Sequence, residues 1–133
     1  KELDIEVVEP DEIFDISCDI FAPCALGAGV NENTIERFDC KIICGAANNQ
    51  LINPMAGYAL KARNILYVPD FLVNAGGVIA IASEINGTEN LLEKHLEKIG
   101  DRLQPVLEES KKNNESTDSV AKRIAWERIN ISR

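Results

Sequence analysis

Three short apolar runs organise the first two thirds of the chain. They begin near residues 18, 41 and 65, a spacing of about 23 residues. Small residues follow each run, and a helix-like segment comes next. A strand, a loop and a helix recurring in this way are typical of successive right-handed βα units. The pattern therefore predicts an α/β fold on a parallel sheet.

The individual elements follow from the same pattern. The chain opens with an apolar run at residues 5–8, which predicts a further short strand. Asp70 is expected to cap the third helix, and Asn64 to end the second. The predicted strands cover residues 18–22, 40–44 and 65–68, and the predicted helices cover residues 31–37, 54–64 and 71–85.

The last third of the chain is helical in character. Thr88 is expected to cap a helix whose apolar residues recur every three or four positions, and Pro105 should kink or interrupt it. We expect residues 108–115 to form a solvated helix end and loop, and a final helix to follow at about 118–130. These last helices should pack across the sheet or onto a partner domain. Trp126 lies off the apolar stripe of that helix and is expected to contact a neighbouring domain or subunit. We therefore divide the chain into residues 1–87 and 88–133.

The small-residue loops locate a candidate site. Loops 23–29, 45–49 and 69–77 should all lie at the carboxyl ends of the strands, where parallel sheets bind ligands. Asn74, Val78 and Ile81 share one helical face. The sequence thus predicts a shallow, uncharged ligand cleft. The alternative is a buried helix whose asparagine caps a neighbouring loop.

Gly76 and Gly77 are costly inside an apolar helix, by about 1 kcal/mol each relative to Ala. They predict a close approach to the backbone, either by a packed strand or by a flat ligand.

Composition narrows the class of partner. The formal net charge is −8 and the sequence pI is about 4.7, so nucleic acid is an unsuitable partner. No apolar run reaches the roughly 20 residues that span a bilayer. The opening Lys1-Glu-Leu-Asp4 is acidic and unlike a secretory signal, so a cytoplasmic location is expected. The absence of an initiator Met suggests a fragment.

The remaining chemistry is sparse. Cys18, Cys24, Cys40 and Cys44 lack metal-ligand spacing, so we expect buried, reduced thiols and no metal. The Gly-x-Gly-x-x-Gly fingerprint, the Walker loop and the Gly-x-Ser-x-Gly elbow are all absent from the sequence. No residue is predicted to be catalytic.

Three motifs carry a family resemblance. They are Asp19-Ile-Phe-Ala-Pro-Cys-Ala-Leu-Gly27, Ala47-Asn-Asn-Gln-Leu51 and Pro69-Asp-Phe-Leu-Val-Asn-Ala-Gly-Gly-Val78. In order and spacing the chain resembles the glutamate/leucine/phenylalanine/valine dehydrogenases, most closely the leucine dehydrogenases. The resemblance implies the second half of a Rossmann-type, NAD-binding domain followed by C-terminal helices. The family's catalytic lysines and aspartate lie in a substrate domain that has no counterpart here.

The resemblance also implies site residues. It places Cys24 and Ala25 along the cofactor and Asn48 near the nicotinamide ribose. Asn74 would lie where substrate and nicotinamide meet, and Val78 and Ile81 would face the substrate side chain. A glutamate-specific member is expected to offer a hydroxyl at the position of Ile81. An aliphatic pair there disfavours a buried carboxylate and favours a leucine-sized group.

The function that follows is reversible, NAD-dependent oxidative deamination of a branched-chain aliphatic L-amino acid to its 2-oxo acid and ammonia. Phenylalanine would also be accepted if the missing domain left room. The chain would be inactive alone, and a homo-oligomer is expected. The alternative is a free-standing, truncated module that binds a nucleotide or a protein without catalysis.

Overall fold

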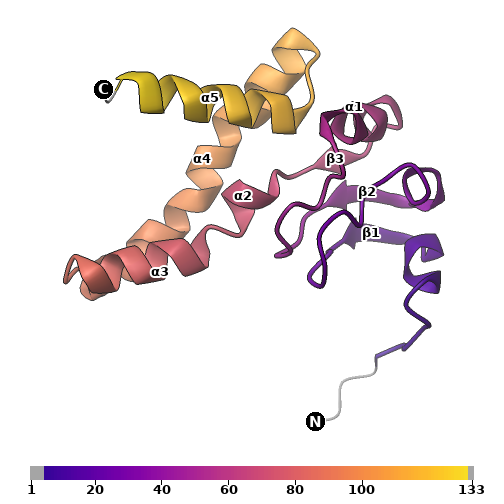
Figure 1. The fold of residues 1–133 in the computed structure, drawn as a ribbon, viewed down its shortest axis with the longest axis horizontal. Helices are drawn as coiled ribbons and strands as arrows, with labels where there is room; N and C mark the ends of the chain where they lie inside the picture. The colour runs from indigo at the N-terminus through magenta and orange to yellow at the C-terminus, as the bar shows by residue number, and fades with distance from the viewer. Residues whose placement is uncertain (1–4, 132–133) are drawn as a thin grey trace.

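The computed structural model describes residues 5–131, and Figure 1 shows their arrangement as an α/β body joined to a helical body. The sheet consists of β1 (Cys18–Phe21), β2 (Cys40–Ile43) and β3 (Leu66–Tyr67), all parallel and in the order β1-β2-β3. The helices and turns around it are η1 (Glu12–Asp15), η2 (Ile35–Arg37), α1 (Pro54–Ala62), α2 (Asp70–Val73), α3 (Gly76–Ile85), η3 (Glu89–Leu91), α4 (Leu92–Asn113) and α5 (Thr117–Ile131). The predicted α/β class, with a parallel sheet followed by C-terminal helices, is confirmed.

The core lies between the sheet and α1. Ile43 and Leu60 are fully buried there, together with Val30, and Phe14, Phe21 and Phe38 pack edge to face or tilted beside them. A smaller cluster of Val106, Val120 and Ala121 joins α4 to α5. The strands are short, and this burial of apolar side chains is what holds the α/β body together.

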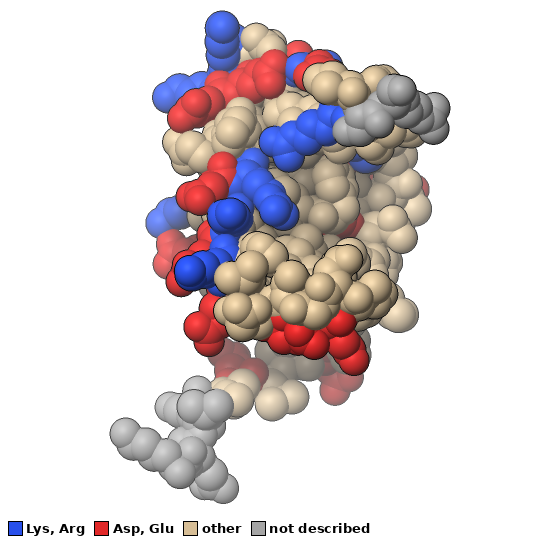
Figure 2. Space-filling view, turned by 90° about the vertical axis from the view of Figure 1, so that its left-hand side faces the viewer, with Lys and Arg blue, Asp and Glu red and all other residues tan. Residues whose placement is uncertain are grey.

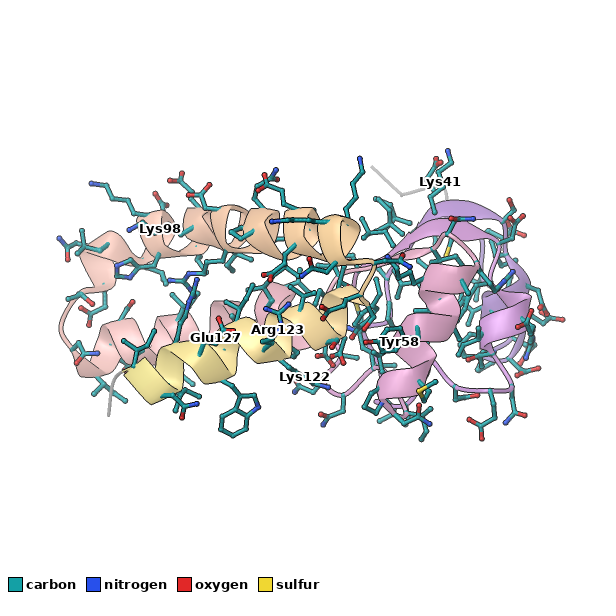
Figure 3. The ribbon with its side chains drawn as sticks, turned by 90° about the horizontal axis from the view of Figure 1, so that it is seen from above. Lys41, Tyr58, Lys98, Lys122, Arg123 and Glu127 are labelled. Carbon is teal, nitrogen blue, oxygen red and sulfur yellow. The ribbon has the colours of Figure 1, made fainter. Side chains whose placement is uncertain are left out.

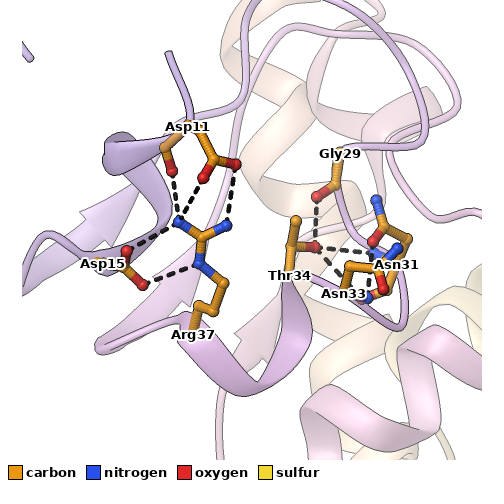
Figure 4. A network of polar contacts seen from close by, with 7 residues as sticks. All are labelled: Asp11, Asp15, Gly29, Asn31, Asn33, Thr34 and Arg37. Carbon is orange, nitrogen blue, oxygen red and sulfur yellow. Dashed lines mark hydrogen bonds and ion pairs between the residues drawn. The ribbon is translucent and has the colours of Figure 1, made fainter. Parts of the chain in front are cut away.

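The start of the described chain differs from the prediction. Residues 5–8 form no strand, and Val7 is 88% exposed. Arg37 instead anchors the following segment by pairing with both Asp11 and Asp15 at 3.0 and 2.8 Å (Figure 4). Residues 1–4, including the acidic opening, lie outside the described residues.

The polar segment 31–37 is not a full helix. Turns lead into the short 3-10 turn η2, and the side chain of Thr34 donates a 2.7 Å hydrogen bond to the carbonyl of Gly29 (Figure 4). The backbone N–H of Asn31 in turn donates to Thr34 Oγ1. These local side-chain bonds compete with a helical ladder, which explains the shorter element.

Helix α1 follows its sequence signals. The side chain of Asn53 accepts from the N–H of Ala56, and Pro54 occupies the first turn. Asn64 has φ +59° just beyond the helix and terminates it, as predicted.

The segment 71–85, which was predicted to be one helix, is divided into α2 and α3. α2 ends at Val73, Asn74 caps it, and a new ladder begins when Ile79 donates to the carbonyl of Ala75. Within the described chain, a Cβ on Gly77 would meet nothing within 4 Å, and one on Gly76 would only touch Leu96 at 3.5 Å. Of the two predicted alternatives, a strand packed against these glycines is therefore wrong, and a flat ligand remains a prediction.

The C-terminal helices also depart from expectation. α4 continues through Pro105 to Asn113, so the proline does not interrupt the helix. The solvated helix end and loop predicted at 108–115 is confirmed, because α4 ends at Asn113 and a turn follows at Asn114. Good helix formers follow Pro105, and the loss of one hydrogen bond does not end such a helix. Thr88 was wrongly predicted as a cap, because its hydroxyl donates back to the carbonyl of Ser83.

α4 and α5 lie side by side, and α5 begins against the sheet (Figures 1 and 3). Arg123 of α5 forms an ion pair with Glu109 of α4 at 2.8 Å. Figure 3 labels Arg123 together with Glu127, a further partner, on the same helix. At the other end of α5, Thr117 Oγ1 donates to the carbonyl of Tyr67 in β3 at 2.5 Å. The last helix is thus bonded to both the helical and the α/β body.

Candidate functional site

The candidate site is built where the three strands end. Cys44 donates from its N–H to the carbonyl of Phe21, and Val68 donates to that of Ile43, so the strand ends stay in register. Ala47 then donates to the carbonyl of Pro23 at 2.9 Å. Because parallel strands place their carboxyl ends at one edge, loops 23–29, 45–49 and 69–77 meet there.

Two glycines allow the first two loops to approach closely. A Cβ on Gly45 would lie 2.2 Å from the carbonyl oxygen of Pro23. A Cβ on Gly27 would lie 2.8 Å from the carbonyl oxygen of Asn48. Neither obstacle is a flexible side chain, so a larger residue at either position would force the loops apart.

The third loop is joined to the second by a pair of asparagines. Asn74 Nδ2 donates to Asn48 Oδ1 at 2.6 Å and is 3.3 Å from the carbonyl oxygen of Ala46. Asn74 comes from the break between α2 and α3, and Asn48 from the loop after β2. The pair is accessible to solvent, and Asn48 Nδ2 and Asn74 Oδ1 form no hydrogen bond within residues 5–131. An amide donor and an amide acceptor are therefore available side by side.

A buried layer lies beneath this pair. The side chain of Gln50 is fully buried, and its Nε2 donates to the carbonyls of Gly45 at 2.7 Å and Ala47 at 2.9 Å. The N–H of Gln50 donates to Asp70 Oδ2 at 2.8 Å, while Asp70 Oδ1 accepts from Phe71. Asp70 was predicted to cap its own helix and does accept one N–H there, yet it also holds the neighbouring loop.

Tyr67 completes the layer. Its hydroxyl accepts from the N–H of Asp70 at 3.3 Å. Burial raises the pKa of Tyr67, and the nearby carboxylate of Asp70 raises it further, so the phenol stays neutral at physiological pH. Gln50 and Tyr67 were not singled out from the sequence, because no local signal distinguishes a buried glutamine from an exposed one.

Cys24 and Ala25 lie on the exposed surface of the first loop. Cys24 Sγ accepts weakly from the N–H of Ala46 at 3.5 Å, so the first loop also contacts the loop that carries Asn48. The prediction that all four thiols are buried was wrong, because Cys24 is exposed and Cys18, Cys40 and Cys44 are only half-buried. All four cysteines are free, and burial raises the pKa of both Cys40 and Cys44.

Val78 and Ile81 stand apart from the amide pair, on α3. Their side chains are 72% and 60% exposed. Figure 2 shows uncharged residues over the middle of one face, with Lys, Arg, Asp and Glu along its left edge and further Asp and Glu below. The structure therefore presents an apolar helical face beyond the polar edge, within a chain that is otherwise rich in charge.

Residues 5–131 contain neither a metal-binding cluster nor a membrane-spanning helix. No group of three or more His, Cys, Asp or Glu side chains there is arranged to hold a metal ion. No helix in that range has the length and apolar character needed to cross a bilayer.

A parallel α/β body whose strands end in small-residue loops at one edge is typical of open α/β domains, a class that binds ligands at that edge. The sequence matches the family model described as Glutamate/Leucine/Phenylalanine/Valine dehydrogenase over residues 1–130. The chain belongs to this family of amino acid dehydrogenases, and the resemblance drawn from its motifs is confirmed.

Individual relatives agree with this assignment. The leucine dehydrogenase of Thermoactinomyces intermedius is 45% identical over 134 residues, which cover 100% of this chain and 37% of that protein. The crystal structure of L-tryptophan dehydrogenase from Nostoc punctiforme has a TM-score of 0.89 at 43% identity, covering 96% of this chain and 39% of that one.

A more distant structure shares the fold. The hetero-hexameric glutamate dehydrogenase of Thermus thermophilus, in a form described as Leu bound, has a TM-score of 0.75 at 20% identity. It covers 99% of this chain and 33% of that one. The chain thus spans a little over a third of the length of the curated relatives it matches.

Proposed function

We propose that this chain is part of an NAD-dependent amino acid dehydrogenase that reversibly deaminates a branched-chain aliphatic L-amino acid to its 2-oxo acid and ammonia. The supporting observation is the Asn48–Asn74 amide pair at the carboxyl edge of the sheet, followed by the exposed apolar face of α3. Family membership supports the reaction class. In this proposal residues 1–87 belong to the cofactor domain, and residues 88–133 pack on it.

The residues at the edge fit a dinucleotide. Cys24, Ala25, Asn48 and Asn74 are uncharged, so they set no carboxylate against its phosphates. Asn48 and Asn74 offer a free donor and a free acceptor, suited to the hydroxyl and amide groups of a nicotinamide riboside. When bound, the nicotinamide supplies the hydride acceptor. The role of this chain is to orient that ring through the amide pair and to hold the substrate beside it.

The substrate preference rests on Val78 and Ile81. Both present only methyl groups from α3, and neither can pair with a charged side chain. Burying a leucine-sized group against them contributes about 1.5–3 kcal/mol, whereas an unpaired carboxylate would be costly there. We therefore propose a branched-chain aliphatic substrate.

The residues that we place beside the substrate, Asn74, Val78 and Ile81, are amide or aliphatic. Such side chains do not act as general acids or bases near neutral pH. We propose that the catalytic lysines belong to a substrate domain of the intact protein and that the chain alone is inactive. We also propose that the intact protein is a homo-oligomer. The alternative, a nucleotide-binding module without catalysis, predicts the same cofactor contacts.

A calorimetric titration of the 133-residue chain with NADH tests the proposal. We expect saturable binding that weakens about tenfold in Asn48→Ala, the effect of losing one hydrogen bond of about 1.4 kcal/mol. Asn113→Ala, at the far end of α4, is the matched control and should bind as the parent does. Binding that is unaffected by Asn48→Ala would contradict the assigned site.

Catalysis needs a second assay on the intact protein. Oxidation of leucine with reduction of NAD supports the dehydrogenase. Cofactor binding without turnover of any amino acid would favour the non-catalytic module instead.

A further inference from the structure

Two buried side chains connect the loops that carry the amide pair. Gln50 lies two residues after Asn48, and Asp70 lies four residues before Asn74. The backbone N–H of Gln50 donates to Asp70 Oδ2 at 2.8 Å. This buried bond joins the loop after β2 to the start of α2, and the exposed contact between Asn48 and Asn74 joins the same loop to the end of α2.

Gln50 also fixes the shape of its own loop. Its Nε2 donates to the carbonyls of Gly45 and Ala47, the residues that precede Asn48. Its Oε1 is buried without a hydrogen-bond partner among residues 5–131. An unsatisfied buried oxygen costs free energy. The two hydrogen bonds from Nε2 therefore hold this side chain in an orientation that leaves Oε1 without a partner.

Asp70 fixes the helix that leads to Asn74, the other member of the amide pair. Its Oδ1 accepts from the N–H of Phe71 at 2.7 Å, and its carbonyl accepts from the N–H of Asn74 at 2.8 Å. The carboxylate therefore orients the one-turn helix at whose end Asn74 stands. Since Asp70 is only 7% exposed, little water competes for these bonds.

We infer that Gln50 and Asp70 are positioning residues, which set the geometry of Asn48 and Asn74 and through them the affinity for the nicotinamide half of the cofactor. The inference rests on the proposed function for its ligand. Neither residue touches the exposed amide pair with its own side chain, so each acts through the loop it holds.

A double-mutant cycle on NADH affinity tests this inference. Gln50→Met keeps the volume of the side chain and removes its donors. We expect it to weaken NADH binding about tenfold, as Asn48→Ala does. If Gln50 acts through Asn48, the double variant should bind no more weakly than Asn48→Ala alone, because coupled residues are not additive. Additive losses, or full affinity in Gln50→Met, would overturn the inference.

Two controls separate positioning from general destabilisation. Gln104→Met makes the same chemical change on the exposed face of α4, where Gln104 donates to Glu108, and should leave the affinity unchanged. Asp70→Asn keeps the shape and one acceptor, and should therefore weaken binding less than Asp70→Ala. Equal losses in the two Asp70 variants would count against an orienting carboxylate.

A second readout does not depend on the cofactor. In nitrogen–proton correlation spectra of the folded chain, the side-chain amide resonances of Asn74 should shift in Gln50→Met and stay in place in Gln104→Met. If the 133-residue chain does not bind NADH, the rest of the proposed cofactor domain supplies most of the affinity, and these spectra still decide the positioning role. Unmoved Asn74 resonances in Gln50→Met would overturn it.

Discussion

Asn74 Nδ2 donates a 2.6 Å hydrogen bond to Asn48 Oδ1, although the two residues are 26 positions apart in the chain. One stands at the break between two helices, and the other follows the middle strand. The contact joins the loop after β2 to the end of α2, at the edge where all three strands end. It joins two of the residues that the sequence had singled out for cofactor binding.

Replacing Asn74 with leucine should weaken NADH binding about tenfold and change the stability little. Leucine has a similar volume but no donor for Asn48 or Ala46, and the pair is accessible to water, which can replace the lost bond in the free protein. Calorimetry and urea unfolding measure the two effects. A loss of stability above about 2 kcal/mol with unchanged affinity would mark the pair as structural.

The exposed thiol provides a probe of the cofactor face. Cys24 is exposed, whereas burial raises the pKa of Cys40 and Cys44, which lowers their reactive thiolate fraction. An alkylating agent at neutral pH should therefore modify Cys24 faster than these two. Saturating NADH should slow modification of Cys24, as followed by mass spectrometry. Cys24→Ser should abolish the fast phase, and a fast phase insensitive to NADH would place the cofactor elsewhere.

Side-chain selection should depend on α3. In the intact dehydrogenase that we propose contains this chain, Ile81→Thr should lower kcat/KM for leucine about tenfold, because a hydroxyl replaces the ethyl group of the isoleucine. Ile85→Thr changes a similarly exposed residue one turn further along α3 and serves as the control. Equal effects of the two variants on leucine and alanine turnover would contradict a specificity role for Ile81.

The hydroxyl of Thr117 should matter for stability. Thr117→Val preserves shape but removes the bond to the buried carbonyl of Tyr67, at a cost of about 1–3 kcal/mol. Thr88→Val removes a longer, 3.4 Å bond to Ser83 at a half-buried position and should cost less. Urea unfolding of both variants measures the difference, and equal losses would show that α5 is not held to β3 through this bond.

The acid dependence of stability should include Asp15. Its hydrogen bond with Arg37 lowers the pKa of this carboxyl in the folded state. The contribution is therefore present above the pKa of the unfolded chain and lost as pH falls through the lower, folded pKa. Unfolding at several acidic pH values should show a shallower dependence in Asp15→Asn. The Asp19→Asn control removes the exposed partner of Lys41, and a change equal to that of Asp15→Asn would contradict the assignment.

Local pattern alone determined the parallel α/β class and the three loops at one edge of the sheet. Strand, loop and helix signals lie within a few residues of one another, and parallel pairing then fixes where the loops meet. For this reason the loops that carry Asn48 and Asn74 are expected at one edge, whereas the family resemblance is what implies that both asparagines contact the cofactor. The run at 5–8 misled because apolar alternation does not supply a neighbouring strand with which to pair.

Tertiary structure alone decided what holds that site. Gln50 is buried among groups from other parts of the chain, and its backbone N–H donates to Asp70, which lies twenty residues further on. The end of α2 at Val73, just before Asn74, likewise depends on contacts with another element. Pro105 likewise stayed within α4 because its helix packs against α2, α3 and α5, and this packing outweighs one lost hydrogen bond. The sequence specifies the local conformational preferences of each segment. Which of these conformations is adopted depends on burial, and burial arises only when distant segments pack together.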